Sequence, residues 1–205
     1  MTLTTWLPLA LICTLGAISP GPSLALVINN TISGGTNRGL MTAIGHGLGV
    51  GLYALITAAG LGVLITQSPL LFTGIQYAGA AFLLYTAINI LRSSRAANGG
   101  EQEDEAAHQG RFVGFGGGFL VAFLNPKLAL FFLALFSQFV SPQQSLFEQL
   151  IMMATAGGID ALWYGLVALG IGKTGLLLLL KRHSVWVDRI SAVIFIGIAA
   201  AVVLQ

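Results

Sequence analysis

Six long apolar stretches run along the chain, separated by short polar segments. They cover residues 4–29, 39–66, 69–91, 112–136, 147–171 and 185–204. A helix needs roughly 20 mainly apolar residues to cross the hydrocarbon core of a bilayer, and each stretch is long enough to do so. The pattern therefore predicts an all-α integral membrane protein with six transmembrane helices, which together form one transmembrane domain over residues 1–205.

The first and the fourth stretches are each interrupted by proline, about half the length of the chain apart. The first contains Ser19, Pro20, Gly21 and Pro22, and the fourth contains the run 125–127. Proline removes a backbone donor and clashes with the preceding turn, so a helix bends or unwinds there. Irregular backbone at membrane depth normally lines a cavity or is buried in protein. Matching breaks in two halves of a chain indicate the binding site of a secondary transporter.

The two breaks also predict internal symmetry. We expect two inverted three-helix repeats in which helices one and four are broken. Repeat 1 covers about residues 4–91 and repeat 2 about 112–204, and a polar cytoplasmic linker joins them over about 92–111. The short apolar stretch 175–180 is expected to extend the fifth helix or to lie at the inner interface.

The positive charges predict how the helices are oriented. The loops on one side carry seven cations: Arg38, Arg92, Arg95, Arg111, Lys173, Lys181 and Arg182. The loops on the other side carry no Lys or Arg. Cytoplasmic loops are enriched in these residues, so we expect both termini to be external.

Two charged residues lie well inside apolar stretches. Lys127 follows the second break, and Asp160 lies near the middle of the fifth stretch. Charges at this depth are costly and usually face a partner or a wet cavity. Lys127 is a candidate for binding a substrate carboxylate, or it reaches the outer interface. Asp160 is a candidate proton carrier, or it forms a structural ion pair with Lys127.

The remaining candidates are the backbone of the breaks and one histidine. Ser19, Pro20, Gly21, Pro22, Asn125 and Pro126 join Lys127 as predicted substrate-binding residues. The helix that starts after Pro22 presents a positive dipole end to an anion, and Asn125 can both donate and accept; alternatively, both breaks only shape packing. His46 is a candidate for proton coupling with Asp160, or an interfacial or packing residue. Asn29 and Asn30 are expected to cap the end of the first helix.

Composition excludes several classes of function. Charged residues make up 8% of the chain and the net charge is +2, which argues against nucleic acid as a partner. Cys13 is the one cysteine, so two-cysteine redox chemistry within the chain is excluded. The sequence has no metal-ligand spacing, phosphate loop or nucleotide fingerprint, so we expect no metal and no cofactor, and no enzymatic activity.

The Pro20-Gly21-Pro22 motif, the glycine-rich second stretch and Asn125-Pro126-Lys127 together resemble the lysine exporter and homoserine/threonine resistance family. Asp160 and Trp163 also fit that pattern. The resemblance implies a bacterial inner-membrane secondary transporter that exports amino acids or close derivatives from the cytoplasm by proton antiport and works as a homodimer. A channel or uniporter for another small polar solute is the main alternative; a membrane enzyme and a scaffold are weaker ones.

Overall fold

The computed structural model describes residues 1–19, 21–93, 113–171 and 176–204. Within these ranges the chain is helical and contains no strand, which confirms the predicted all-α class. The helices are α1 (Leu3–Ile18), α2 (Pro22–Gln67), α3 (Pro69–Ser93), α5 (Gly114–Phe123), α6 (Pro126–Phe136), α7 (Leu146–Ile171) and α8 (Leu176–Val203). Most of the linker predicted over 92–111 lies outside the described residues, as does Lys173.

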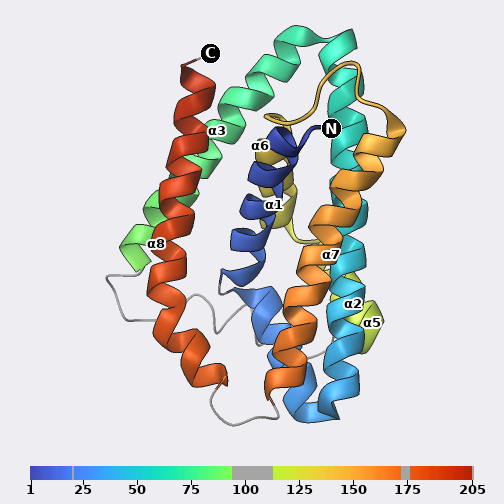
Figure 1. Cartoon of the computed structure of the whole chain (residues 1–205), viewed down its shortest axis with the longest axis vertical. Coiled ribbons are helices and arrows are strands. Elements are labelled where there is room, and N and C mark those ends of the chain that lie inside the picture. Colours follow the sequence, from blue (N-terminus) through green and yellow to red (C-terminus); the bar gives the residue numbers. More distant parts are fainter. Residues whose placement is uncertain (20, 94–112, 172–175, 205) are drawn as a thin grey trace.

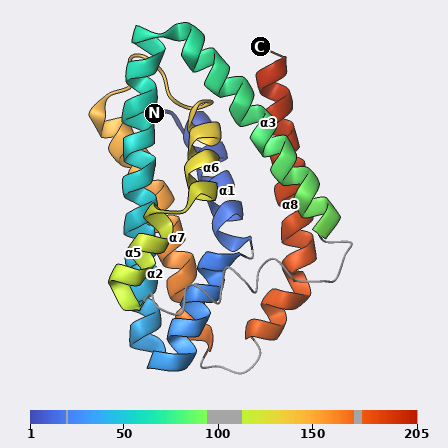
Figure 2. The ribbon, with the colours of Figure 1, turned by 180° about the vertical axis from the view of Figure 1, so that it is seen from behind.

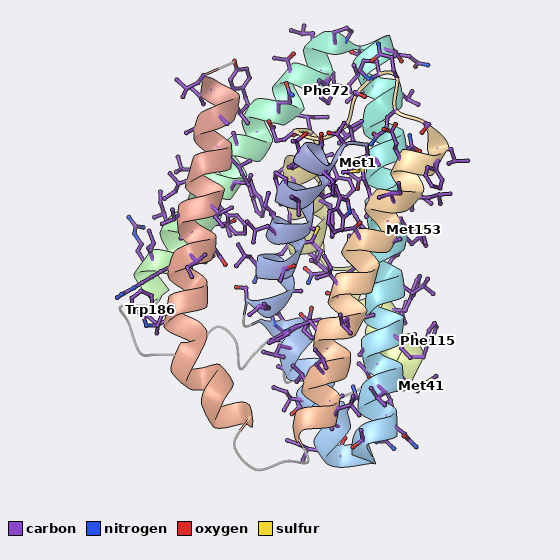
Figure 3. All side chains as sticks on the ribbon, in the orientation of Figure 1. Met1, Met41, Phe72, Phe115, Met153 and Trp186 are labelled. Atoms are coloured by element: carbon purple, nitrogen blue, oxygen red, sulfur yellow. The ribbon has the colours of Figure 1, made fainter. Side chains whose placement is uncertain are left out.

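Three helices are long and apolar enough to cross a membrane by themselves. They lie within Pro22–Gln67, Pro69–Arg92 and Leu146–Gly170, and the bent pair of α5 and α6 counts as a fourth candidate span. The outer surface of these helices is apolar: Leu70 is 86% exposed and Leu166 is 53% exposed. In Figure 3, Met41, Phe115 and Trp186 point away from the helix bundle. Apolar side chains that cover the outside are expected where lipid rather than water is the solvent.

Both predicted helix breaks are present. Helix α1 ends at Ile18 and α2 begins at Pro22, while α5 ends at Phe123 and α6 begins at Pro126 with a bend of 58°. Proline at a first helical position costs no hydrogen bond, because that N–H has no partner within the helix anyway. Figures 1 and 2 show both breaks near the middle of the long axis.

Helix α2 contains a sharp bend at Gly35, whose φ of 78° and ψ of 171° are not helical. The bend divides α2 into a short segment (22–34) and a long segment (36–67). The expectation that Asn29 and Asn30 cap the first helix is wrong, because the helix continues past both residues. The Asn30 side chain instead donates to the carbonyl of Leu26 in the preceding turn (3.2 Å).

Helix α8 begins earlier than the last apolar stretch predicts. The stretch 175–180 was expected to extend the fifth helix or to lie at the inner interface; the first alternative is wrong, because residues from Leu176 onward belong to α8. The apolar part of α8 starts at Arg189, whose guanidinium lies 5.6 Å from the centre of the Trp186 ring. An arginine stacked on an exposed tryptophan is a favourable cation–π contact.

The helices pack as a central group and a flanking pair. Helix α2 makes its most extensive contacts with α7 and α5, and α3 packs mainly against α8. Figure 1 shows both termini toward one end of the molecule, at the side of the α2–α3 junction, and the bend of α2 at the opposite end. A small cluster of buried residues beside the first break joins both segments of α2 to α7; it consists of Leu24, Val27, Ala43, Tyr164, Val167 and Ala168.

The crossing of α2 and α7 depends on glycine. A Cβ atom on Gly47 would lie 2.5 Å from the Cβ of Ala161 and 2.6 Å from the carbonyl oxygen of Gly157. A Cβ on Gly157 would lie 2.5 Å from the carbonyl oxygen of Gly47. Small residues on both helices thus allow the two backbones to approach closely, which is typical of helix packing in membranes.

Candidate functional site

A buried histidine–aspartate pair lies at this crossing. His46 on α2 and Asp160 on α7 directly precede Gly47 and Ala161, the residues at which the helices come closest. His46 Nδ1 and Asp160 Oδ2 are 2.7 Å apart, and the two side chains are 1% and 9% exposed. The close helix approach therefore explains why two side chains from distant parts of the chain form so short a contact.

The pair leaves one histidine nitrogen available. With the Asp160 carboxylate as acceptor, Nδ1 carries the proton and donates it to Oδ2. The other ring nitrogen, Nε2, is buried and has no hydrogen-bond partner among the described residues. In the neutral imidazole this nitrogen is an acceptor, and it becomes a donor when the ring is protonated. The pair can thus take up a proton while the Nδ1 contact stays in place.

Three further side chains surround the pair. The ring of Tyr164 meets the imidazole of His46 edge to face, with centroids 5.1 Å apart and planes at 82°. Tyr164 packs in one buried cluster with Leu24 and Val27 at the start of α2, and its phenol lies within reach of the Ser23 hydroxyl there. Cys13 on α1 is buried and lies near enough to Asp160 for the two groups to interact electrostatically. The pair therefore lies beside the first helix break.

The first break leaves the start of α2 without a cap. The N–H of Ser19 closes α1 by donating to Leu15 (3.0 Å), and no side chain caps α2 at Gly21. The first N–H of α2 that has a partner in the described chain is that of Ala25, which donates to the Gly21 carbonyl (3.1 Å). Pro20 lies outside the described residues. The N-terminal end of α2 thus has no side-chain cap, and a role of this end in binding an anion stays a prediction.

The second break is built differently. The Asn125 side-chain oxygen accepts from the N–H groups of Lys127 (2.9 Å) and Leu128 (3.4 Å), and so caps α6. We expected this amide to offer a substrate both a donor and an acceptor. The oxygen is already engaged as a helix cap, so only the Nδ2 group remains, and the start of α6 is less open to an anion than the start of α2.

The two charges inside the apolar stretches do not pair with each other. The ion-pair contact that Asp160 forms within the described chain is with His46, whereas Lys127 is exposed in the first turn of α6 beside Pro126. The alternative of a structural Lys127–Asp160 pair is therefore wrong. His46 is buried within the helix bundle, where its partner is Asp160.

Sequence reasoning undervalued two residues of this site. The sequence did not single out Tyr164 or Ser23 as site residues. Asp160 and Tyr164 are four positions apart, a spacing that places two side chains on the same face of a helix, and this signal was available in the sequence. The contact of Tyr164 with Ser23 joins α7 to the other side of the bend in α2, and spacing along the chain does not indicate it.

These features define a helical membrane protein with interrupted helices around a buried titratable pair. The family model described as LysE type translocator matches residues 14–205, and the chain belongs to this family, whose members are transporters and not enzymes.

The curated relatives agree with this membership. The chain is 29% identical over 187 residues to the homoserine/homoserine lactone efflux protein of Salmonella typhimurium, covering 91% of this chain and 85% of the relative. It is 30% identical to the protein of the same description from Salmonella typhi, with the same coverage. It is also 30% identical to an uncharacterized membrane protein of Vibrio cholerae, covering 82% of each chain. No solved structure matches the chain.

Proposed function

We propose that this protein is a secondary transporter that exports amino acids or close derivatives from the bacterial cytoplasm in exchange for protons. Family membership supports transport, and two relatives described as efflux proteins for homoserine and its lactone support this class of cargo. The observation that carries the proton step is the His46–Asp160 pair, because it is titratable, buried and next to a broken helix. Buried titratable groups inside membranes are typical of proton pathways.

Six spans arranged as two inverted repeats fit the helices. The first span would be α1 with the short segment of α2, and the fourth would be α5 with α6. The long segment of α2 would be the second span and pack on the fifth, α7, and the third, α3, would pack on the sixth, α8. Pairing of equivalent elements is what a pseudo-two-fold axis in the membrane plane would produce.

The substrate would bind between the two breaks. The uncapped start of α2 after Ser19, Pro20, Gly21 and Pro22 would bind a carboxylate or carbonyl oxygen. Asn125 would contribute its Nδ2 group, with Pro126 setting the bend of the backbone. Lys127, which is exposed in the first turn of α6, is the cationic candidate for the substrate carboxylate.

Proton coupling follows from the charge states of the pair. With Asp160 ionised and His46 neutral, the pair is anionic and favours the state that binds a cationic or zwitterionic substrate. A proton that arrives from outside neutralises the pair and favours the return of the empty carrier. Two states with different proton affinity are the minimum requirement for exchange.

The test is efflux from proteoliposomes preloaded with labelled homoserine, homoserine lactone and a panel of amino acids, with and without an imposed pH gradient. We expect gradient-driven efflux of at least one of these compounds, and loss of the gradient dependence in Asp160→Asn. Efflux that ignores the gradient in both proteins would refute antiport and favour a channel or uniporter. If no compound in the panel moves, the proposed cargo is wrong.

A further inference from the structure

Tyr164 contacts both parts of the proposed transport site. Its side chain is 4% exposed, its ring lies against the imidazole of His46, and its phenol interacts with Ser23. We propose that Tyr164 is a positioning residue that couples substrate binding at the first break to the proton affinity of the His46–Asp160 pair. This inference rests on the proposed function. It assigns to one side chain the link between the substrate-binding step and the proton-binding step.

The contact with His46 fixes the orientation of the imidazole. An edge-to-face pair at this distance has a preferred geometry, so rotation of the imidazole would disrupt the packing of the two rings. The orientation that the contact favours directs Nδ1 toward Asp160 Oδ2. Since Asp160 and Tyr164 are on the same face of α7, one rigid helix holds both the acceptor of the Nδ1 proton and the ring that orients its donor.

The contact with Ser23 links Tyr164 to the first helix break. Ser23 is the second residue of α2 and is 8% exposed, so its hydroxyl is held in the first turn after the break. A carboxylate bound at the uncapped start of α2 would draw this turn toward it and change the contact with the phenol. The ring of Tyr164 would then shift against the imidazole and alter the hydrogen bond that stabilises the charged pair. Hydrogen bonding to the charged form of a group is one of the main determinants of its proton affinity.

Few other ionisable groups face the pair from the helices around it. Helix α1 contributes Cys13, and the described residues of α5 contain no ionisable side chain. On α6 the ionisable residue is Lys127, which is exposed, and on α7 Glu148 lies three turns before Asp160. On α2 itself, Arg38 is exposed two turns before His46. Tyr164 is therefore well placed to control how the pair responds to substrate.

The test uses the full-length protein in proteoliposomes and measures efflux as a function of pH. We expect Tyr164→Phe to keep transport but to move the pH of half-maximal efflux by about half a unit, a roughly threefold change in proton affinity. Fewer protons should also be exchanged per substrate. Ser23→Ala should have the same effects, and the double variant should show no further shift, because both changes remove one interaction. Tyr53→Phe removes a phenol from the same helix as His46, at a ring that contacts Phe123 and Phe132, and is the matched control.

The outcomes separate this inference from the proposed function. An unchanged pH profile in both Tyr164→Phe and Ser23→Ala, together with loss of gradient dependence in Asp160→Asn, refutes the role of Tyr164 and leaves proton antiport intact. Additive shifts in the double variant also refute it. If Tyr164→Phe does not fold, Ser23→Ala and Ser23→Thr decide the question, since the threonine variant retains a hydroxyl and should behave as the native protein.

Discussion

His46 and Asp160 are 114 positions apart in the chain, and their side chains meet at 2.7 Å in the interior of the helix bundle. The contact joins the long segment of α2 to α7 and places a titratable pair next to a broken helix. Neither residue has another described ion-pair partner. Stability and proposed transport chemistry therefore depend on the same contact.

Removing the imidazole of His46 should destabilise the protein, and asparagine at this position should restore most of the stability. His46→Ala leaves a buried carboxylate without its partner, which typically costs about 3–5 kcal/mol. His46→Asn should recover most of that loss, because its amide can donate to Asp160 from nearly the position of Nδ1. We expect the melting temperature in detergent to decrease in the order native, His46→Asn, His46→Ala.

Ile44→Ala is the control for the histidine variants, because Ile44 is on the same helix and is 52% exposed. A melting temperature of His46→Ala within one or two degrees of this control would show that the pair does not stabilise the fold.

Adjacent glycines on α7 should respond in opposite ways to alanine. A Cβ on Gly157 would meet the Gly47 carbonyl oxygen at 2.5 Å, whereas a Cβ on Gly158 has no atom within 4 Å. Gly157→Ala must push α2 and α7 apart and should lower the yield of folded protein severalfold. Gly158→Ala should be neutral or slightly stabilising, because alanine favours helix by about 1 kcal/mol over glycine.

Size-exclusion profiles and melting curves of the two alanine variants in detergent measure this difference. Equal behaviour would mean that α2 and α7 do not cross as closely as the structure shows. Gly157→Ala should also reduce transport, since a wider crossing separates His46 from Asp160.

The bend in α2 should require glycine for its backbone conformation rather than for space. Gly35 has a positive φ, and a Cβ there would meet nothing within 4 Å. Gly35→Ala should therefore destabilise the protein by about 1–3 kcal/mol through backbone strain alone. Gly60→Ala is the matched control within α2, because Gly60 also has open space but is helical. A neutral Gly35→Ala variant in thermal melting would contradict the strained bend.

The sequence predicted the elements that depend on local composition. Apolar length predicted membrane helices, and Pro22 and Pro126 marked the starts of α2 and α6. Gly35 lies in the polar segment between the first two apolar stretches, and the sequence did not predict its sharp bend. Glycine permits a positive φ but does not require it, so its presence alone does not mark a bend. The Asn30 side chain was assigned a cap because asparagine favours helix ends, but in the structure it bonds within its own helix.

The site was predictable in its residues but not in its pairing. His46 and Asp160 were each singled out because charge and imidazole are rare inside apolar stretches. Their contact depends on the register of α2 against α7, which Gly47, Gly157 and Ala161 set through close packing. A single sequence contains many glycines and does not show which of them face each other across two helices. The sequence therefore left open whether Asp160 pairs with Lys127, the opposite charge, and did not predict the contact with His46 that the helix crossing produces.

Asn125 should be replaceable by another capping residue if its main role is to cap α6. Its side-chain oxygen accepts from two backbone N–H groups, and loss of such a cap costs about 0.5–2 kcal/mol. We expect Asn125→Ser to retain stability and Asn125→Ala to lower the melting temperature by a few degrees. Efflux of labelled substrate then distinguishes a capping role of Asn125 from a role in substrate binding. If Asn125→Ser is stable but impaired in transport, the Nδ2 group takes part in substrate recognition. Full activity of this variant limits Asn125 to the cap.

The distribution of positive charge should determine the orientation of the protein in the membrane. The predicted loops on one side of the membrane carry seven cations, and those on the other side carry none. Both termini are therefore expected outside the cytoplasm. Thr2 and Asn37 are both exposed, and they lie next to the N-terminus and the bend of α2, which Figure 1 shows toward opposite ends of the molecule. The native Cys13 is buried and should give little background. In intact cells a membrane-impermeant thiol reagent should label Thr2→Cys and not Asn37→Cys. Permeabilised cells should show labelling of both variants. The opposite pattern would mean that the termini are cytoplasmic, and the proposed direction of proton entry to the His46–Asp160 pair would then have to be reversed.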